Sequence, residues 1–282
     1  MDVFSEIRPL KAFLSQEKKE LNSIGFVPTM GALHKGHLSL IEASRSENRL
    51  TVCSIFVNPA QFNNPADLAR YPRTLEKDKL LLEKAKCNVL FCPDTAQMYS
   101  SQSRVIFDFG ELDKTMEGYY RPGHFSGVAL VVSKLLNIVT PDRAYFGQKD
   151  YQQFKIIEKL VDDLKFDVSL RCMPIIREPD GLAMSSRNAR LTQVQRNKAP
   201  VFYQSLEEAK SLLRHGDSMK NVRALIAGKM ERMGDVKLEY LELADTTNLT
   251  PTENVSDNTV LLIAGYVGEI RLIDNLLMKD ED

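Results

Sequence analysis

The stretch Ile24-Gly-Phe-Val-Pro-Thr-Met-Gly-Ala-Leu-His-Lys-Gly-His37 decides how this chain is expected to fold. It opens with the short apolar run Ile24–Thr29, which is typical of a buried strand. A helical period follows over His37–Glu47. A strand, a glycine-containing loop and a helix form the first half of a βαβ unit, so a parallel sheet is expected. Open α/β sheets bind ligands at the carboxyl ends of their strands, which makes Met30–His37 the first candidate site.

The same alternation continues through the first two-thirds of the chain. The runs that predict strands are Ile24–Thr29, Leu50–Val57, Asn88–Cys92, Arg104–Phe109, Arg143–Phe146 and Asp167–Met173. The helical periods between them are His37–Glu47, Thr74–Lys86, Phe125–Ile138 and Tyr151–Leu164. Strands that alternate with helices predict βαβ units, and hence an α/β domain with a parallel sheet and right-handed crossovers.

The pattern changes after Met173. A polar loop, Arg177–Arg190, leads into a long helical stretch at Thr192–Arg214 and a second helix near Met219–Arg232. Three strand-like runs follow, with a tight turn expected at Val267-Gly268: Lys237–Leu243, Thr259–Tyr266 and Glu269–Ile273. Helices followed by an antiparallel hairpin predict a separate, smaller α+β domain. We therefore divide the chain into residues 1–176 and residues 177–282.

Composition narrows the class of protein. The chain has 282 residues, 43% of them hydrophobic, with 37 Lys and Arg against 38 Asp and Glu. This balance disfavours a nucleic-acid partner, because phosphate neutralisation needs a basic surface. The longest apolar stretch, Val128–Val139, is too short to span a bilayer, and the charged start Met1–Lys19 resembles no signal peptide. We expect a cytoplasmic protein that does not bind membranes.

The four cysteines include no Cys-x-x-Cys pair, which leaves zinc and thioredoxin-like sites without support. Cys53, Cys92 and Cys172 lie in strand-like runs, so buried, reduced thiols are expected. Such thiols fit a reducing cytoplasm.

Two histidines three residues apart, His34 and His37, are the first candidate catalytic residues. A helix N-terminus offers main-chain N–H groups and partial positive charge to a phosphate. Gly31 and Gly36 allow the backbone to approach a ligand closely. The loop matches neither a P-loop nor a Gly-x-Gly-x-x-Gly motif. A single histidine is usually an ordinary polar residue in a turn, but the pair at this spacing indicates donors to a phosphate that gains charge during displacement.

Three further polar clusters are candidates for ligand contacts. Met184-Ser-Ser-Arg187 offers hydroxyls and an Arg fork for a polyphosphate, although alone it could be an ordinary interdomain linker. At its place near the domain boundary it is a candidate lid. In Gly147–Gln153, Lys149 suits a phosphate, Asp150 a ribose hydroxyl or a helix cap, and Gln153 a polar substrate. Asn58 and Gln61 follow the second strand and suit a polar group or carboxylate; Asn58-Pro59 alone could be turn chemistry.

Taken together, these motifs resemble the pantothenate synthetase (pantoate–β-alanine ligase) family. The matching segments run through most of the chain in the family's order: Pro28–His37, Ser54–Phe62, Tyr71–Thr74, Arg121–Phe125, Phe146–Gln153, Gly181–Asn188 and Arg271–Asn275. Departures are Gln148 where Glu is expected, Met184 where Leu is common and Ala60 where Met is common. They leave the matched polar groups in place.

The resemblance implies a Rossmann-like parallel-sheet domain over residues 1–176, which binds ATP and pantoate, and a smaller lid domain over 177–282. The implied ATP contacts are Met30, Gly31, Ala32, Leu33, His34, Lys35, Gly36, His37, Gly147, Gln148, Lys149, Asp150, Ile176, Met184, Ser185, Ser186 and Arg187. The implied substrate contacts are Gln61, Gln153, Asn58 and Met30. The catalytic group is expected to comprise His37, His34, Lys149 and Arg187.

The expected partners are pantoate, β-alanine and ATP with Mg²⁺, and the expected assembly is a homodimer. Pantoate would be adenylated and then captured by β-alanine. The Mg²⁺ ligands are not defined by the sequence; Asp78 and Asp150 are candidates. Other interpretations are a nucleotidyltransferase of the same His-x-Gly-His class, an RNA-binding module, and a metabolite-binding relative without activity. The uncharged Gln61 and Gln153 disfavour a phosphorylated acceptor, the balanced charge disfavours RNA, and the presence of both histidines and Lys149 disfavours an inactive relative.

Overall fold

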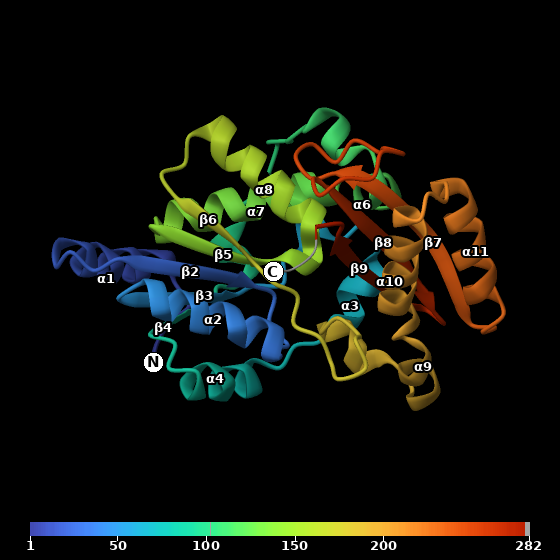
Figure 1. Cartoon of the computed structure of the whole chain (residues 1–282). Helices are drawn as coiled ribbons and strands as arrows, with labels where there is room; N and C mark the ends of the chain where they lie inside the picture. Colours follow the sequence, from blue (N-terminus) through green and yellow to red (C-terminus); the bar gives the residue numbers. More distant parts are fainter. Residues whose placement is uncertain (102, 280–282) are drawn as a thin grey trace. The chain divides into compact units, whose positions relative to one another are not determined.

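The computed structural model describes residues 1–101 and 103–279 of the chain (Figure 1). The chain divides into two compact units. The first comprises Met1–Gly147 and Gln153–Pro174, and the second comprises Gln148–Gln152 and the residues from Ile175 onward.

The first unit is built on a six-stranded sheet in the order β1-β4-β3-β2-β5-β6, and all neighbouring strands are parallel. The strands are β1 (Asp2–Phe4), β2 (Ile24–Thr29), β3 (Leu50–Ile55), β4 (Val89–Phe91), β5 (Arg143–Gly147) and β6 (Ser169–Met173). The long helices are α1 (Ile7–Lys19), α2 (Lys35–Glu47), α4 (Leu75–Lys84), α7 (His124–Val139) and α8 (Tyr151–Leu164). Shorter helices are η1 (Pro59–Gln61), α3 (Pro65–Arg70), α5 (Thr95–Met98), η2 (Gly110–Asp113) and α6 (Met116–Tyr120). The predicted Rossmann-like parallel sheet is confirmed.

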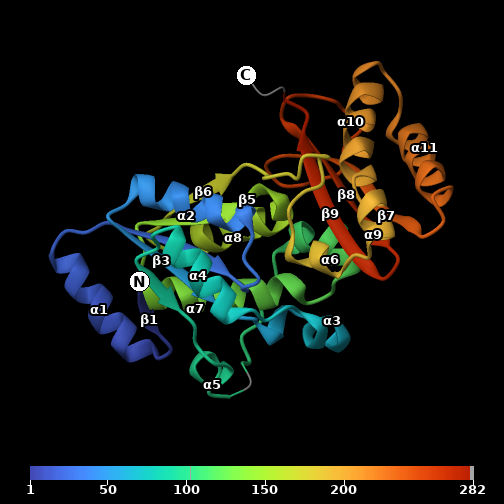
Figure 2. The ribbon, with the colours of Figure 1, turned by 90° about the horizontal axis from the view of Figure 1, so that it is seen from below.

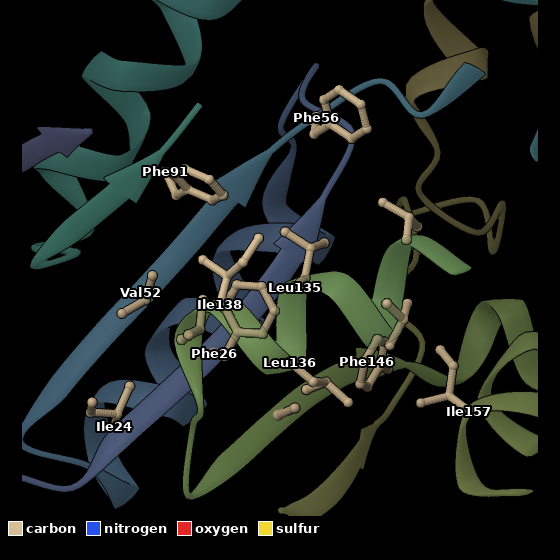
Figure 3. Close-up of a cluster of buried hydrophobic side chains, with 14 of the residues drawn as sticks. Ile24, Phe26, Val52, Phe56, Phe91, Leu135, Leu136, Ile138, Phe146 and Ile157 are labelled. Carbon is tan, nitrogen blue, oxygen red and sulfur yellow. The ribbon is translucent and has the colours of Figure 1, made fainter. Parts of the chain in front are cut away.

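Residues along each central strand alternate between two hydrophobic cores, as the period of a strand requires. Phe26 of β2 faces the core formed with α1, α7 and α8, whereas its neighbour Val27 faces the core formed with α2 and α4. Figure 3 shows the first of these cores, where Phe26 and Phe146 lie with Leu135 and Leu136 of α7. Figures 1 and 2 show α2 and α4 on one face of the sheet and α7 on the other. Burial on both faces explains why these strands are continuously apolar in sequence.

The second unit contains a three-stranded antiparallel sheet in the order β7-β8-β9. Its elements are η3 (Gln148–Asp150), η4 (Ser186–Arg190), α9 (Gln193–Lys198), α10 (Val201–Arg214), α11 (Met219–Glu231), β7 (Val236–Asp245), β8 (Thr259–Val267) and β9 (Ile270–Leu277). Its core joins α10 and α11 to the three strands. The predicted α+β character of this part of the chain is confirmed.

Local predictions differ from the structure in four places. Val267 pairs with Ile270, so the two-residue turn is Gly268-Glu269 and not Val267-Gly268. The predicted helix Thr192–Arg214 is divided into α9 and α10, because Pro200 lacks the N–H that would continue α9. The predicted strand Arg104–Phe109 belongs to neither sheet, whereas the three-residue strand β1 was too short to be detected in the sequence.

All four cysteines are free thiols. Cys53 and Cys87 are buried and Cys92 is half-buried, but Cys172 is exposed, so the prediction of burial is wrong for Cys172. It lies on β6, an edge strand of the sheet, where one neighbouring strand is missing. Within residues 1–101 and 103–279, no helix is both long enough and apolar enough to cross a membrane.

Candidate active site

The loop that follows β2 is held in place by the carboxylate of Asp78, on α4. Its Oδ2 accepts the N–H of Ala32 at 2.9 Å, and its Oδ1 accepts the N–H of Leu33 at 2.8 Å. The Thr74 hydroxyl donates to both oxygens at 3.2 Å, and only 1% of Asp78 is exposed. Gly31 and Ala32 take positive φ values of 81° and 50°, which turn the chain away from the strand. The buried carboxylate therefore anchors the loop, and both of its oxygens accept hydrogen bonds from the protein.

The two predicted histidines form the cap of α2. His34 is the N-cap, and its Nδ1 accepts the N–H of Gly36 at 3.2 Å. In return, Nδ1 of His37 accepts the N–H of His34 at 3.3 Å, and the two rings lie 4.0 Å apart. This is a capping box in which histidines replace the usual Ser or Thr and Glu. A ring nitrogen that accepts carries no proton, so in both neutral rings the proton is on Nε2.

The histidine cap changes one expectation for this loop. The sequence predicted that unpaired main-chain N–H groups would receive a phosphate. In the structure the N–H groups of Gly31, Ala32, Leu33, His34 and Gly36 already have protein acceptors. The cap therefore fixes the orientation of both rings at the start of α2, with the ring proton of each on Nε2.

The turn after β3 places Gln61 beside this loop. Gln61, at the end of η1, is 7% exposed, and its Nε2 lies 3.2 Å from the sulfur of Met30. Asn58 is 1% exposed and donates to Gln61 Oε1 and to the carbonyl of Gly127, both at 3.0 Å. The structure therefore brings three of the predicted substrate residues together, and Asn58 orients the amide of Gln61.

Two neighbours fix Asn58 and η1. The hydroxyl of Tyr99 donates to Oδ1 of Asn58 at 2.7 Å, and burial raises the pKa of Tyr99 to about 12, so this donor persists at neutral pH. On the other side, η1 packs directly on α7 at Gly127. A Cβ at Gly127 would lie 2.2 Å from the carbonyl oxygen of Ala60, so only glycine permits this approach.

The motif Arg121-Pro-Gly-His-Phe125 supports the same turn. Nδ1 of His124 lies 2.8 Å from the carbonyl oxygen of Gln61, and its Nε2 lies 3.0 Å from the guanidinium of Arg121. A carbonyl only accepts and a guanidinium only donates, so His124 is the neutral tautomer with its proton on Nδ1. Arg121 also approaches the carboxylate of Glu117 at 3.5 Å. This chain of contacts fixes the backbone of Gln61.

A cavity of about 340 Å³ opens beside the same loop. Its walls come from the carboxyl ends of β2, β3 and β4, which is where ligands bind in open α/β sheets. Lining residues include Met30, Gly31, Val57, Asp78, Cys92 and Asp94.

The remaining predicted residues of the first unit lie near strand ends. Gly147 ends β5, and Gln153 is half-buried in the first turn of α8. Lys35 is exposed at the first position of α2.

In the second unit, Asn275 of β9 holds the turn η3. Its Nδ2 donates to the carbonyls of Gln148 and Lys149, both at 2.9 Å, and its Oδ1 accepts from Nε2 of Gln148 at 3.1 Å. The ammonium of Lys149 lies 3.5 Å from the carboxylate of Asp150. Asn275 is 1% exposed, so this arrangement is a built feature of the unit.

The loop that contains Met184-Ser-Ser-Arg187 is anchored by Arg177. Its guanidinium forms two hydrogen bonds with the carboxylate of Asp274, at 2.6 and 3.1 Å, and donates to the carbonyl of Gly181 at 3.1 Å. It also stacks on the ring of Tyr203 at 3.9 Å. The side chain of Asp274 is 2% exposed, so the pair is almost entirely removed from water.

The residues that follow Arg177 are ordered by local bonds. The N–H of Met184 donates to the carbonyl of Ile176 at 3.0 Å. Ser185 caps η4, since its hydroxyl accepts the N–H of Arg187 at 3.2 Å. Ser186 and Arg187 are half-buried at the start of η4.

The described part of the chain contains no group of three or more His, Cys, Asp or Glu side chains that could hold a metal ion. Of the two Mg²⁺ candidates, Asp78 is committed to the loop and Asp150 is paired with Lys149.

Comparison with known proteins decides the family. A family model described as Pantoate-beta-alanine ligase matches residues 2–277. A pantothenate synthetase from Thermotoga neapolitana is 45% identical over 280 residues, which cover 99% of this chain and 100% of the relative. The chain belongs to the pantoate–β-alanine ligase family. This confirms the resemblance drawn from its motifs, and the protein is a ligase.

Solved structures of pantoate–β-alanine ligases agree with this fold. A pantothenate synthetase from Thermus thermophilus has a TM-score of 0.92 at 41% identity, covering 99% of this chain and all of that one. A pantoate–β-alanine ligase from Francisella tularensis, in complex with βγ-ATP and β-alanine, has a TM-score of 0.85 at 36% identity. That alignment covers 100% of this chain and 99% of that one.

Several positioning residues of this ligase were missed or given another role in the sequence. Asp78 was considered as a Mg²⁺ candidate, and Tyr99, His124, Arg177 and Asp274 were assigned no role. Asp78 contacts a residue 45 positions away in the sequence, and Asp274 contacts one 97 positions away. A local sequence pattern cannot predict contacts of this kind. Only the histidine cap had a local signal, the three-residue spacing of a capping box.

Proposed function

We propose that this ligase condenses (R)-pantoate with β-alanine to form pantothenate through a pantoyl-adenylate, releasing pyrophosphate and then AMP. The observation that carries the proposal is the cap of α2. It orients two histidines, His34 and His37, at the carboxyl end of β2, with each Nδ1 accepting a main-chain N–H and each ring proton on Nε2. Membership of the family supplies the substrates, and ATP and β-alanine are those of the Francisella structure.

The chemical problem is that a carboxylate resists attack by an amine, because its oxygen is a poor leaving group. In the first step a carboxylate oxygen of pantoate attacks the α-phosphorus of ATP. The bond between the α-phosphorus and the bridging oxygen breaks, and pyrophosphate leaves. Negative charge grows on the phosphate oxygens, so hydrogen-bond donors that are already oriented lower the barrier.

His34 and His37 are proposed to donate to those oxygens, with the cations Lys149 and Arg187 as further charge partners. The other predicted ATP contacts, over Met30–His37, Gly147–Asp150, Ile176 and Met184–Arg187, stay part of this proposal. Mg²⁺ is proposed to enter with ATP as the MgATP substrate, because this ion is usually bound through substrate phosphates with one or two carboxylates.

Gln61 and Gln153 are proposed to hold pantoate through uncharged amides. The amide of Gln61 is oriented by Asn58, and its backbone is held by His124. In the second step the amine of β-alanine attacks the acyl carbon, the bond from carbon to the bridging oxygen breaks, and AMP leaves. Holding amine and adenylate together can supply several kcal/mol by orientation alone, so no protein nucleophile is needed.

The test is release of pyrophosphate and AMP from MgATP and pantoate, with and without β-alanine. We expect pyrophosphate without AMP when β-alanine is omitted, and stoichiometric AMP and pantothenate when it is present. Pyrophosphate release that ignores pantoate would remove the substrate assignment and favour a nucleotidyltransferase. A lid role for residues 177–282, a homodimeric assembly and a cytoplasmic location complete the proposal.

A further inference from the structure

Asn275, on β9, holds the turn η3 with both ends of its side-chain amide. The residue is 1% exposed, and its Nδ2 donates to the carbonyls of Gln148 and Lys149, both at 2.9 Å. Its Oδ1 accepts from Nε2 of Gln148 at 3.1 Å. Because a carbonyl oxygen only accepts, the amide nitrogen must face the two carbonyls, and this fixes the orientation of the amide. These three bonds hold the main chain of η3 in one place.

The side chain of Gln148 adds a bond that depends on the residue found in this chain. Glutamate is expected at this position, and a carboxylate could not donate to Oδ1 of Asn275. Gln148 therefore belongs to the same hydrogen-bonded group as Asn275. The turn is tied to β9 through its main chain and through this side chain.

The turn matters for the reaction because Lys149 lies in its middle. Lys149 belongs to the second compact unit together with β9, although in sequence it lies between β5 and α8. Its side chain is 18% exposed, and its ammonium lies 3.5 Å from the carboxylate of Asp150. A lysine carries its charge on a flexible carbon stem, so the charge is aimed only if the main chain below it is fixed. Asn275 fixes that main chain at the carbonyl of Lys149 itself.

The neighbouring residue Asp274 anchors the second segment that carries a proposed cation. Its carboxylate binds the guanidinium of Arg177, at the start of the loop that leads to Arg187. The N–H of Asn275 donates to Oδ1 of Asp274 at 2.8 Å, and Arg177 donates to the carbonyl of Asn275 at 3.3 Å. Burial raises the pKa of Asp274, and the charges of Arg177 and Lys149 oppose that rise. Two consecutive residues of β9 therefore hold both segments.

We infer that Asn275 is a positioning residue of this ligase: by holding the carbonyls of η3 it aims the ammonium of Lys149 at the phosphates of ATP. The inference rests on the proposed function, in which Lys149 is a charge partner of those phosphates. Asn275 acts through Lys149 and not on the reacting atoms. Charges stabilise a transition state best when they are oriented beforehand, so loss of Asn275 should slow adenylation although no charge is removed.

The test is a double-mutant cycle on the rate of adenylate formation, measured as pre-steady-state release of pyrophosphate from MgATP and pantoate. Lys149→Met should lower this rate by about 10²–10³, because one charge partner is lost. Asn275→Ala should lower it by about tenfold to a hundredfold, because the main chain of Lys149 is released. In the Lys149→Met background, Asn275→Ala should change the rate by less than about twofold, because no ammonium is left to position.

Two further variants separate positioning from loss of stability. Val236→Ala is the matched control, because Val236 is 2% exposed in the core of the second unit, on β7, which does not pair with β9. It should lower the free energy of unfolding but leave the adenylation rate of the folded protein within about twofold. Asn275→Asp keeps the size of the side chain but cannot donate to the carbonyls, so it should repeat the effect of Asn275→Ala. It takes the place of Asn275→Ala in the cycle if that variant does not fold.

The outcomes distinguish this inference from the proposed function. A wild-type rate in the Asn275 variants, or the same slowing with and without Lys149, would overturn the positioning role and leave Lys149 in the mechanism. A wild-type rate in Lys149→Met would remove Lys149 from the proposed mechanism, and the inference with it.

Discussion

The two polar loops proposed to meet ATP are stabilised in opposite ways. Loop Met30–His34 is held by an anion, Asp78, which accepts main-chain N–H groups. Loop Arg177–Arg190 is held by a cation, Arg177, which donates to the carbonyl of Gly181 and is neutralised by Asp274. In the first loop the histidines that cap the helix are also the proposed catalytic donors. In the second, the anchor Arg177 is separate from the proposed catalytic residue Arg187.

This difference has a consequence for mutations. In the second loop, anchoring and chemistry can be disturbed separately. In the first loop, a histidine substitution disturbs both the helix cap, which uses Nδ1, and the proposed catalytic contact, which uses Nε2. The two roles can be separated only by a side chain that replaces one of these nitrogens and not the other. Four substitutions test this division.

The largest effect is expected from Arg177→Met. It leaves the buried carboxylate of Asp274 without its partner, and breaking a buried ion pair costs about 3–5 kcal/mol. Chemical denaturation should show this loss in the free energy of unfolding. Adding Asp274→Asn should recover much of it, because no unpaired charge then remains buried. A single variant as stable as the wild type would show that the pair does not anchor the loop.

His37→Asn should have the next largest effect. Asparagine retains an acceptor for the N–H of His34 but lacks the Nε2 donor, so the cap survives and the catalytic contact is lost. The rate of adenylate formation should fall by about 10²–10³ with little change in unfolding free energy. His37→Gln is the matched control, since it can place a donor near Nε2 and should retain more activity. Equal activity of His37→Asn and the wild type would remove the assigned role.

Asp78→Asn tests whether the anchor of the first loop serves catalysis. The two oxygens of Asp78 accept the N–H groups of Ala32 and Leu33, whereas an asparagine amide has only one acceptor oxygen. One buried N–H therefore loses its partner, which should lower the free energy of unfolding by about 1–3 kcal/mol. Displacement of the loop should also lower the adenylation rate, by up to about a hundredfold. Asp108→Asn is the control, because its carboxylate accepts a main-chain N–H, that of Gly110, and does not line the cavity. Full activity of Asp78→Asn would mean that the histidines are positioned without it.

The smallest effect is expected from Ser185→Ala. It removes the cap of η4, which typically costs about 1 kcal/mol. Because the change loosens Ser186 and Arg187 without removing a charge, KM for ATP should rise by less than about tenfold with kcat nearly unchanged. A large fall in kcat, measured by steady-state kinetics, would indicate a direct role for the Ser185 hydroxyl.

The same contrast explains what could be predicted from the sequence. Strand Ile24–Thr29 and helix Tyr151–Leu164 were predicted with the bounds found in the structure, because their hydrophobic periods are set by burial against one sheet. The positions of His34 and His37 followed from local spacing. Asp78 and Asp274 act across the fold, so their roles depend on tertiary contacts that no local pattern records.

The segment Arg104–Phe109 was predicted as a strand but belongs to neither sheet. Its alternating pattern is present in the structure, with Phe107 and Phe109 inward and Ile106 outward, but no neighbouring strand is available among the described residues of the first unit. Sequence pattern reports the environment of side chains, whereas a strand also needs a partner for its backbone.

The most direct test of the central claim follows oxygen atoms through the reaction. Pantoate labelled with ¹⁸O in its carboxylate is incubated with MgATP and β-alanine, and the products are analysed by mass spectrometry. Attack of pantoate at the α-phosphorus, beside the histidine cap, predicts one ¹⁸O atom in each AMP and none in pyrophosphate. Label in pyrophosphate or inorganic phosphate, with unlabelled AMP, would place the attack elsewhere and contradict the account.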